Sequence, residues 1–441
     1  MSRGQGFGQS PASGFTRNSV VQPSLTLPPI PRELFTPYVP TEYFHKDEWI
    51  WHLTGGYVEE QLRSAPASFI EKIGDKTDYV QGRAFPHLQI KNYTTNVPVD
   101  SGALAHVALG DLYAELDRRI ASGEKAQYGE KDCTMIFITR GDDASIGYVD
   151  VAAQQASGAN ARAMFQCASN FNGVEATQEI YAPNTPNIVS FYVYNRTQGP
   201  TAAVSAGGAA ITRCLAPFYD ENTDPAAWGQ TETRQLESLG ELGRYFTVQN
   251  GYVVNNGSEA IIPPATSADF RRELNKVKVM AHLDAEVTSA SRSGDYIGCV
   301  GDKHVVSQVM CATMNVGQGN AGYTNAQLPG AMDKIEFLLR AAYEGAYAAA
   351  ICNGCDQLYL TLIGGGALGN DINVIHKVIG ETHAKFVKTH NTSLRRVYLP
   401  YFGQPAQPAF DNLKQTLTRQ GLPYMWYHCQ NGASSIVEEQ S

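Results

Sequence analysis

The chain has 441 residues, of which 43% are apolar and 17% are charged, so it is long enough for one large or two ordinary globular domains with a substantial core. The net charge is −9 and no long run of lysine and arginine occurs, which argues against an extended nucleic-acid surface. No stretch of about 18 apolar residues and no secretory leader occurs, so we expect no membrane span and a cytoplasmic protein, in the host cytosol if the chain is a secreted effector.

The first part of the chain divides into two segments. Residues 1–40 are rich in glycine, serine, proline and glutamine, which predicts a disordered tail. Residues 41–131 mix aromatic and charged residues, and the apolar positions of residues 103–122 recur at helical spacing. We therefore expect a mostly helical accessory region packed on the core.

From residue 132 onward the pattern is that of an α/β domain. Apolar, β-prone runs predict strands at residues 134–139, 162–168, 187–194, 276–283, 305–314, 357–363 and 393–399. Helical periodicity predicts helices at residues 333–350, 371–390 and 410–420. Strands that alternate with helices predict one layered α/β domain over residues 132–441, and turn signals mark about 216–275 as an insertion.

A glycine run follows the predicted strand that ends at residue 363. It reads Gly364-Gly365-Gly366-Ala367-Leu368-Gly369-Asn370, and a helical pattern begins near Asp371. Glycines let backbone N–H groups approach an anion, and the start of a helix adds a partial positive charge, so the run is a candidate phosphate cradle. Its G-x-G-x-x-G spacing also fits a dinucleotide site, but it lies late in the chain and no acidic residue follows about 20 residues on. A tight turn that binds nothing is the other alternative.

Two more polar loops follow predicted strands. Gly141-Asp142-Asp143 follows the first strand of the α/β domain, and Ala168-Ser169-Asn170 leads into Asn172 and Gly173. With the glycine run, these motifs occur in an order that resembles the macrodomain family, which binds ADP-ribose, over about residues 134–400. The resemblance implies a three-layer, macrodomain-like mixed sheet between helices, with a helical N-terminal elaboration and the insertion. It also implies that Asp142 or Asp143 binds the adenine, that Asn170 binds the distal ribose, that residues 364–370 wrap the diphosphate, and that Asn172 and Gly173 belong to the ADP-ribose site.

A closer resemblance rests on residues 327–336 and the alanine-rich helix that follows. This part is similar to MavL-type macrodomains, which remove ADP-ribose from an arginine of ubiquitin. The resemblance implies a hydrolase of a mono-ADP-ribosylated protein, modified at arginine, with ubiquitin as a candidate partner, ADP-ribose as ligand or product and no cofactor. A non-catalytic ADP-ribose reader and an NAD-binding Rossmann-type enzyme stay open as alternatives.

Hydrolysis at the anomeric carbon of the distal ribose needs carboxyl groups, because the transition state resembles an oxocarbenium ion and the leaving group needs an acid. Asp333 and Glu336 lie three residues apart at the start of a predicted helix and share a face, so we predict them as the catalytic pair. In the alternative, Asp333 favours the helix dipole and Glu336 pairs with Arg340. The rival candidates are two acids that follow the second predicted strand, Glu175 and Glu179.

No metal site is expected from the sequence. Cys352 and Cys355 form a CxxC motif without a second pair, which favours two buried thiols over zinc binding. The histidines are scattered and none has the spacing of a known ligand motif. The predicted hydrolysis is therefore metal-free.

Overall fold

The computed structural model describes residues 33–123, 132–390 and 393–441. The predicted tail lies outside the described residues up to residue 32. Its boundary at residue 40 is corrected, because residues 33–40 pack on the domain. Leu34 is buried, and the Tyr38 hydroxyl donates a hydrogen bond to the carbonyl oxygen of Cys299 at 3.2 Å.

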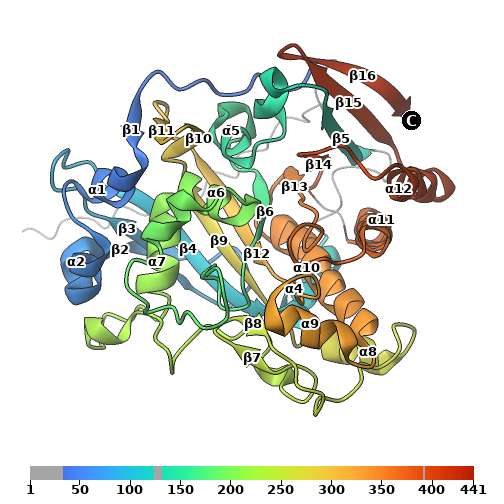
Figure 1. Cartoon of the computed structure of the whole chain (residues 1–441), viewed down its shortest axis with the longest axis horizontal. Helices are drawn as coiled ribbons and strands as arrows, with labels where there is room; N and C mark the ends of the chain where they lie inside the picture. The colour runs from blue at the N-terminus through green and yellow to red at the C-terminus, as the bar shows by residue number, and fades with distance from the viewer. Residues whose placement is uncertain (1–32, 124–131, 391–392) are drawn as a thin grey trace, which may run out of the picture. The chain divides into compact units, whose positions relative to one another are not determined.

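Eleven strands of the described residues form one large mixed sheet (Figure 1). Six neighbouring strands are parallel, in the spatial order β15 (Tyr424–Gln430), β5 (Thr134–Arg140), β14 (Arg396–Pro400), β13 (Gln357–Tyr359), β6 (Met164–Ala168) and β12 (Val305–Cys311). The antiparallel strands β9 (Lys278–Glu286), β4 (Val99–Ala108), β3 (Phe85–Ile90) and β2 (Ile70–Lys76) extend the sheet beyond β12, and β16 (Ala433–Gln440) extends it beyond β15.

Two small antiparallel sheets accompany the large one. The first contains β1 (Tyr43–His45), β11 (Tyr296–Cys299) and β10 (Ser289–Ser293). The second contains β7 (Val248–Gln249) and β8 (Tyr252–Val253), and it belongs to the insertion.

Helices cover both faces of the large sheet, and a separate hydrophobic cluster lies between the sheet and the helices on each face. One face carries α4 (Leu109–Ala121), α8 (Ala268–Leu274), α9 (Gly319–Gln327), α10 (Ala331–Cys352), α11 (Ile372–Thr389) and α12 (Gln407–Gln420). The other carries α1 (Trp49–Thr54), α2 (Glu59–Ser64), α3 (Pro66–Phe69), α5 (Val151–Ala156), α6 (Gln198–Ser205) and α7 (Gly207–Leu215). The expected fold class, a three-layer α/β domain with a mixed sheet between helices, is confirmed.

The N-terminal region is less helical than its pattern predicts. It supplies α1 to α4, but also β2, β3 and β4 of the large sheet. The helix expected from residue 103 begins only at Leu109, because residues 103–108 pair with β9. Sheet pairing thus overrides the helical spacing of the apolar positions there.

The strand expected at residues 187–194 is absent from the described chain, where residues 190–194 form a short 3-10 helix. Pro183 and Pro186 precede it, and Asn187 has a φ of 60°, so the backbone turns where the apolar residues suggested extension. The other predicted strands and helices of the α/β domain are present with shifted ends. Among the described helices, none is long and apolar enough to cross a membrane.

Candidate functional site

The parallel strands β13 and β6 are neighbours, but the chain leaves them in opposite directions. After β13 it continues through α11 to β14, and after β6 it continues through α6 and α7, on the other face, toward β12. In open α/β sheets such a reversal leaves a crevice outside the carboxyl ends of the two strands, where ligands bind. The sheet order therefore marks the loops after β6 and β13 as the candidate site.

Contacts through the loop after β12 hold these loops together. Ser169 N–H donates to the carbonyl oxygen of Cys311 at 2.8 Å, which joins the β6 loop to the end of β12. Val316 N–H donates to the carbonyl oxygen of Leu368 at 2.9 Å, which joins the β12 loop to the glycine run. The motifs at 168–173 and 364–370, almost 200 residues apart in sequence, thus belong to one edge of the sheet.

The glycine run has the geometry that a phosphate cradle requires. Gly364 and Gly369 have φ values of 76° and 69°, and a Cβ on Gly369 would lie 2.6 Å from the Cα of Gly317. Asn370 is buried and fixes the loop, because it accepts a hydrogen bond from Thr313 at 2.9 Å and donates to Met314 and Leu368.

The middle of the same run is open. Gly365, Gly366 and Ala367 are exposed, and a Cβ on Gly366 would meet nothing within 4 Å. Within the described chain, the N–H groups of Gly366, Ala367 and Leu368 form no hydrogen bond with the protein. Three free N–H groups on a fixed loop suit an anion.

The helix after the cradle contributes less than expected. It begins at Ile372 as predicted, but its N-cap Asp371 accepts a hydrogen bond from Asn373 N–H at 2.8 Å. This carboxylate already satisfies part of the helix terminus and offsets its positive partial charge. The anion-binding capacity therefore lies in the loop itself.

The side chains of the β6 loop mostly shape the loop. The Asn170 amide donates to the carbonyl oxygen of Val174 at 3.1 Å, and Asn172 accepts from Val174 N–H at 3.0 Å. Gly173 has a φ of 74°, and a Cβ there would lie 2.3 Å from the sulfur of Met280. The binding roles of Asn170, Asn172 and Gly173 stay predictions, and only the backbone and the Asn170 oxygen are left for a ligand.

Glu175 stands out chemically in this loop. Its Oε2 is enclosed and, among the described residues, has no hydrogen-bond partner, while the residue as a whole is half-buried. Gly199 packs directly on this oxygen, since a Cβ on Gly199 would lie 2.1 Å from it. Burial raises the pKa of Glu175 to about 8, although the nearby Arg213 lowers it in part. The carboxyl group is therefore mostly protonated at neutral pH.

Arg213 of α7 was not anticipated as part of this region. It is 1% exposed, and its Nε donates to the carbonyl oxygen of Gly173 at 2.7 Å. None of the described acids lies within ion-pair distance of it. The available signal was an arginine within the otherwise apolar helix at residues 207–215.

The predicted catalytic pair lies elsewhere on α10. Leu338, Ala342 and Gly345 line a small cavity together with Asn170, so they mark the side of α10 nearest the β6 loop. At about 100° per residue, Asp333 and Glu336 lie roughly 140° and 160° around the helix from Leu338. The two acids thus project away from the β6 loop.

Each acid of that pair also has a structural role. Asp333 is exposed in the first turn of α10. Glu336 accepts from Arg340 at 2.6 Å and from Lys377 at 3.1 Å. Burial raises the pKa of Glu336, but these two cations outweigh it and leave the pKa below its usual value. The Glu336–Arg340 pair considered from the sequence is formed, and a catalytic role for either acid stays a prediction.

The loop after β5 lies at the same sheet edge but uses its carboxylates locally. Asp142 accepts from Ser145 N–H at 3.0 Å and from Asn431 N–H at 2.7 Å. Asp143 is exposed and accepts from Arg140 at 2.8 Å. Either could still accept an adenine amino group, and this role stays a prediction.

The described residues contain no group of three or more His, Cys, Asp or Glu side chains that could hold a metal ion. Cys352 and Cys355 are buried free thiols, as the sequence predicted.

No protein-family model and no curated protein matches the chain. Among solved structures, it is similar to the poly(ADP-ribose) glycohydrolase from Deinococcus radiodurans in complex with ADP-ribose, with 11% identity, 72% of this chain and 94% of that chain covered, and a TM-score of 0.40. The poly(ADP-ribose) glycohydrolase from Thermomonospora curvata matches with 14% identity, 71% and 85% coverage and a TM-score of 0.39. The latter enzyme bound to the inhibitor ADP-HPD matches with 13% identity, 71% and 84% coverage and a TM-score of 0.36.

These matches correct one expectation from the sequence. The identification of the chain as a MavL-type macrodomain is wrong, because the solved structures that match are poly(ADP-ribose) glycohydrolases, a distinct family. Identities of 9–14% and TM-scores of 0.33–0.40 do not establish membership of that family either. The candidate function therefore rests on the fold of this chain and on the loops at the carboxyl ends of β6 and β13.

Proposed function

We propose that this chain hydrolyses the glycosidic bond at the distal ribose of an ADP-ribose group, carried by a modified protein. The observation that carries the proposal is Glu175, an enclosed carboxyl group with a pKa of about 8 on the β6 loop, at the sheet edge where the β13 loop offers the free N–H groups of residues 366–368. A protonated acid on one loop and an anion-binding backbone on the other suit cleavage at a sugar attached to a diphosphate.

In this mechanism the cradle holds the diphosphate and Glu175 acts as general acid. The bond between the anomeric carbon and the leaving atom breaks, and the proton of Glu175 moves to the leaving group. Water then adds to the oxocarbenium-like ribose, and the proton it releases returns to the Glu175 carboxylate. Burial favours the neutral form of the acid, so it is ready to donate at neutral pH.

The finer assignments of substrate and adenine contact come from the family resemblance of the sequence and are part of the proposal. Arginine is the proposed modified residue, and ubiquitin is a candidate modified protein. Asp142 or Asp143 would accept the adenine amino group, and Asp333 and Glu336 are the alternative catalytic acids.

The test combines calorimetry with ADP-ribose and an assay for release of ADP-ribose from an arginine-modified protein. Glu175→Gln should retain ADP-ribose binding and lower kcat by about 10²–10⁴-fold, the usual contribution of a general acid. Glu179→Gln, four residues on and without a contact through its carboxylate in the described structure, tests the other rival acid and should keep activity. Unchanged turnover in Glu175→Gln, with loss in Asp333→Ala or Glu336→Gln, would move the chemistry to α10.

Substitution in the cradle tests the binding half of the proposal. Gly366→Ala adds a methyl group in open space, so the fold should be unchanged while ADP-ribose binding weakens by about tenfold. Gly74→Ala, equally unobstructed but on β2, is the control and should bind normally. Binding without turnover in the wild type would favour a reader, and absence of ADP-ribose binding would refute the proposal.

A further inference from the structure

The carboxyl group of Glu175 lies next to a backbone oxygen. The position that a Cβ of Gly199 would occupy is 2.1 Å from Glu175 Oε2 and 1.9 Å from the carbonyl oxygen of Ala168. The two oxygens are therefore no more than about 4 Å apart, because each lies about 2 Å from the same point. Since residue 199 is a glycine, no side chain of this residue separates them.

This pair of oxygens favours the protonated form of Glu175. A carbonyl oxygen and an ionised carboxylate both accept hydrogen bonds and repel each other, whereas a protonated carboxyl group donates. Glu175 Oε2 is enclosed and no donor among the described residues reaches it, while Oε1 is not enclosed. The Ala168 carbonyl oxygen thus becomes a partner of Oε2 when this oxygen carries the proton.

Ala168 is held from both sides at the end of β6. Its N–H donates to Oε1 of Gln198 at 2.8 Å, and Nε2 of Gln198 donates to the carbonyl oxygen of Gln166 at 2.9 Å. The Gln198 amide thus takes the place of a neighbouring strand, since β13 no longer pairs with β6 at this level. On the β12 side, Ser169 N–H donates to the carbonyl oxygen of Cys311 at 2.8 Å. The carbonyl group of Ala168 therefore has a fixed direction.

Gln198 and Gly199 belong to the first turn of α6, which packs beside β6 (Figure 1). Gly199 is buried, and a Cβ on it would also lie 2.8 Å from the carbonyl carbon of Ala168. A side chain at this position would therefore meet backbone, which cannot move aside as a flexible side chain does. One helical turn thus supplies both the clamp on Ala168 and the room for Glu175.

The charged and titratable groups of the described residues that act on Glu175 come from four elements, namely Arg213 of α7, Tyr192 of the 3-10 helix at residues 190–194, Tyr252 of β8 and Cys167 of β6. Burial raises the pKa of Tyr252 to about 12, and it raises the pKa values of Tyr192 and Cys167 above their ordinary 10 and 9. A titration near pH 8 in this region therefore belongs to Glu175.

We propose that Gly199 and Gln198 are positioning residues for the acid: Gly199 leaves room for a hydrogen bond from the protonated Glu175 carboxyl to the Ala168 carbonyl oxygen, and Gln198 holds that carbonyl in place. The inference rests on the proposed function, since it takes Glu175 as the general acid. The proton rests on the enclosed oxygen until substrate binds. A half-turn about the terminal torsion, which is broad and two-fold, then brings the O–H to the open side. There the O–H bond breaks, the proton passes to the leaving group and a carboxylate remains.

The first test is a pH titration of the wild-type full chain by NMR. Labelling with ¹³C-carbonyl alanine and ¹⁵N-serine selects alanine–serine pairs, and Ser169→Ala identifies the signal of Ala168. The Ala168 carbonyl signal should shift with a midpoint at about pH 8, because its hydrogen-bond donor is lost as Glu175 ionises. Glu175→Gln has no proton to lose, so the shift should be absent there. An Ala168 signal that stays constant while Glu175 ionises would overturn the inference.

The second test is the pH profile of ADP-ribose release. Gln198→Met keeps the length of the side chain but removes the clamp, so the neutral acid loses a stabilising partner and its pKa falls. The basic limb of the kcat profile should therefore move down by about one pH unit, with ADP-ribose binding unchanged. Gly199→Ala should lower kcat at least about tenfold and also keep ADP-ribose binding.

Gln155→Met is the matched control. Gln155 is a buried glutamine of α5 that donates to the carbonyl oxygen of Ala202 in α6 at 3.4 Å, so its loss also loosens α6 but leaves Ala168 untouched. Its pH profile should be that of the wild type. An equal shift in both variants, or none in Gln198→Met, would refute the positioning role. If the variants do not fold, the wild-type titration of Ala168 still decides.

The two levels of the proposal fail in different ways. A wild type that releases no ADP-ribose refutes the proposed function, whatever the Ala168 signal does. Intact turnover with an Ala168 signal that does not follow Glu175 refutes the positioning role alone.

Discussion

At the scale of single residues, the unusual group is a carboxyl that the protein keeps neutral. The Tyr192 hydroxyl accepts a hydrogen bond from the backbone N–H of Glu175 at 2.9 Å, so this contact orients the residue without stabilising a negative charge on its carboxyl group. The enclosed Oε2 likewise lacks a partner within the described part of the chain. A buried carboxyl group in such surroundings costs stability once it ionises, which is typical of a functional rather than a structural acid.

This leads to a prediction about stability and pH. The pKa is 4.5 for an ordinary glutamate and about 8 for Glu175 in the folded protein. Between pH 4.5 and pH 8 the folded state therefore keeps a proton that the unfolded state has lost. The wild type therefore loses stability as pH rises from about 4.5 to about 8, by on the order of 1 kcal/mol per pH unit. Glu175→Gln cannot ionise, so its stability advantage should grow from pH 5 to pH 8 in calorimetric unfolding. A stability difference between the wild type and Glu175→Gln that stays constant from pH 5 to pH 8 would contradict the prediction.

At the scale of elements, a buried ionic cluster fastens α10 to its neighbours. Glu344 of α10 accepts from Arg271 of α8 at 3.0 Å, from Lys385 of α11 at 3.0 Å and from Tyr113 of α4 at 2.5 Å. Burial raises the pKa of Glu344, but the two cations outweigh it and lower the pKa overall. One carboxylate thus links four helices on the face that supports the cradle.

Removal of this carboxylate should destabilise the domain strongly. Glu344→Ala leaves the partly exposed Arg271 and Lys385 without their counter-charge and removes their hydrogen bonds, so the free energy of unfolding should fall by about 1.5–3 kcal/mol. Because the folded pKa of Glu344 is depressed, its contribution should also vanish as pH falls below the ordinary value of 4.5. Urea unfolding measures both effects. Glu381→Gln breaks an exposed pair with Arg340 and should cost no more than about 1 kcal/mol; an equal cost for both would contradict the prediction.

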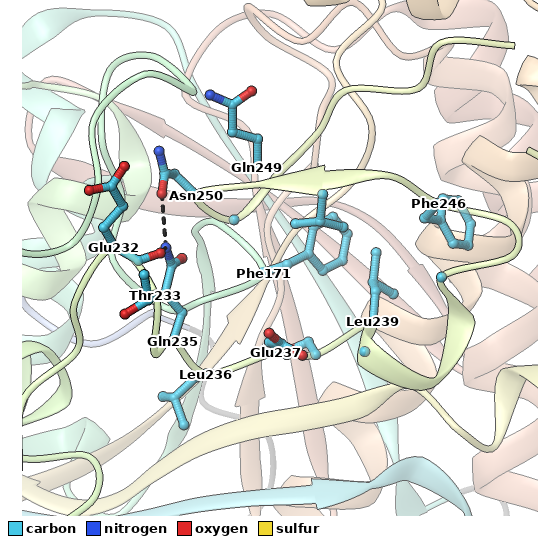
Figure 2. Close-up of a pocket in the computed structure, with 15 residues that line it drawn as sticks. Phe171, Glu232, Thr233, Gln235, Leu236, Glu237, Leu239, Phe246, Gln249 and Asn250 are labelled. Carbon is cyan, nitrogen blue, oxygen red and sulfur yellow. Dashed lines mark hydrogen bonds between the residues drawn. The ribbon is translucent and has the colours of Figure 1, made fainter. Parts of the chain in front are cut away.

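At the scale of the whole domain, the insertion is coupled to the crevice. Gln235 accepts from Asn172 of the β6 loop at 2.9 Å and donates to Asn250 at 2.8 Å (Figure 2). Asn250 in turn donates to the carbonyl oxygen of Glu179 at 2.9 Å. One side chain therefore joins two segments of the insertion to the loop that carries Glu175.

Loss of this link should loosen the crevice without unfolding the protein. Gln235→Ala should increase amide hydrogen exchange in residues 168–175 and 247–252 and lower stability by about 1–2 kcal/mol, because Asn172 and Asn250 each lose a partner. Gln249 lines the cavity of Figure 2 together with Gln235, but its side chain makes no hydrogen bond in the described structure. Gln249→Ala is therefore the control. Unchanged exchange in the β6 loop would show that the insertion and the crevice are independent.

Elements with a strong local pattern could be predicted from the sequence. The buried apolar run of β5 and the periodic apolar faces of α10, α11 and α12 lie where their residues predict them. Strands β2, β3 and β4 could not be predicted as part of the main sheet, because their place depends on pairing with β9, which is about 180 residues away from β4 in sequence.

The glycine run was apparent in the sequence because a tight loop after a strand demands glycine locally, and its role as a phosphate cradle stays a prediction. Sequence spacing singled out Asp333 and Glu336 because a helix repeats every 3.6 residues, but it could not say which side of α10 meets the β6 loop. The raised pKa of Glu175 was decided by tertiary structure alone. Gly199 packs on its carboxyl oxygen, and the charge of Arg213 acts on it from another helix. Local sequence pattern thus determined the layered α/β fold and the tight glycine loop after β13, whereas the raised pKa of Glu175 depends on desolvation by segments that only the folded chain brings together.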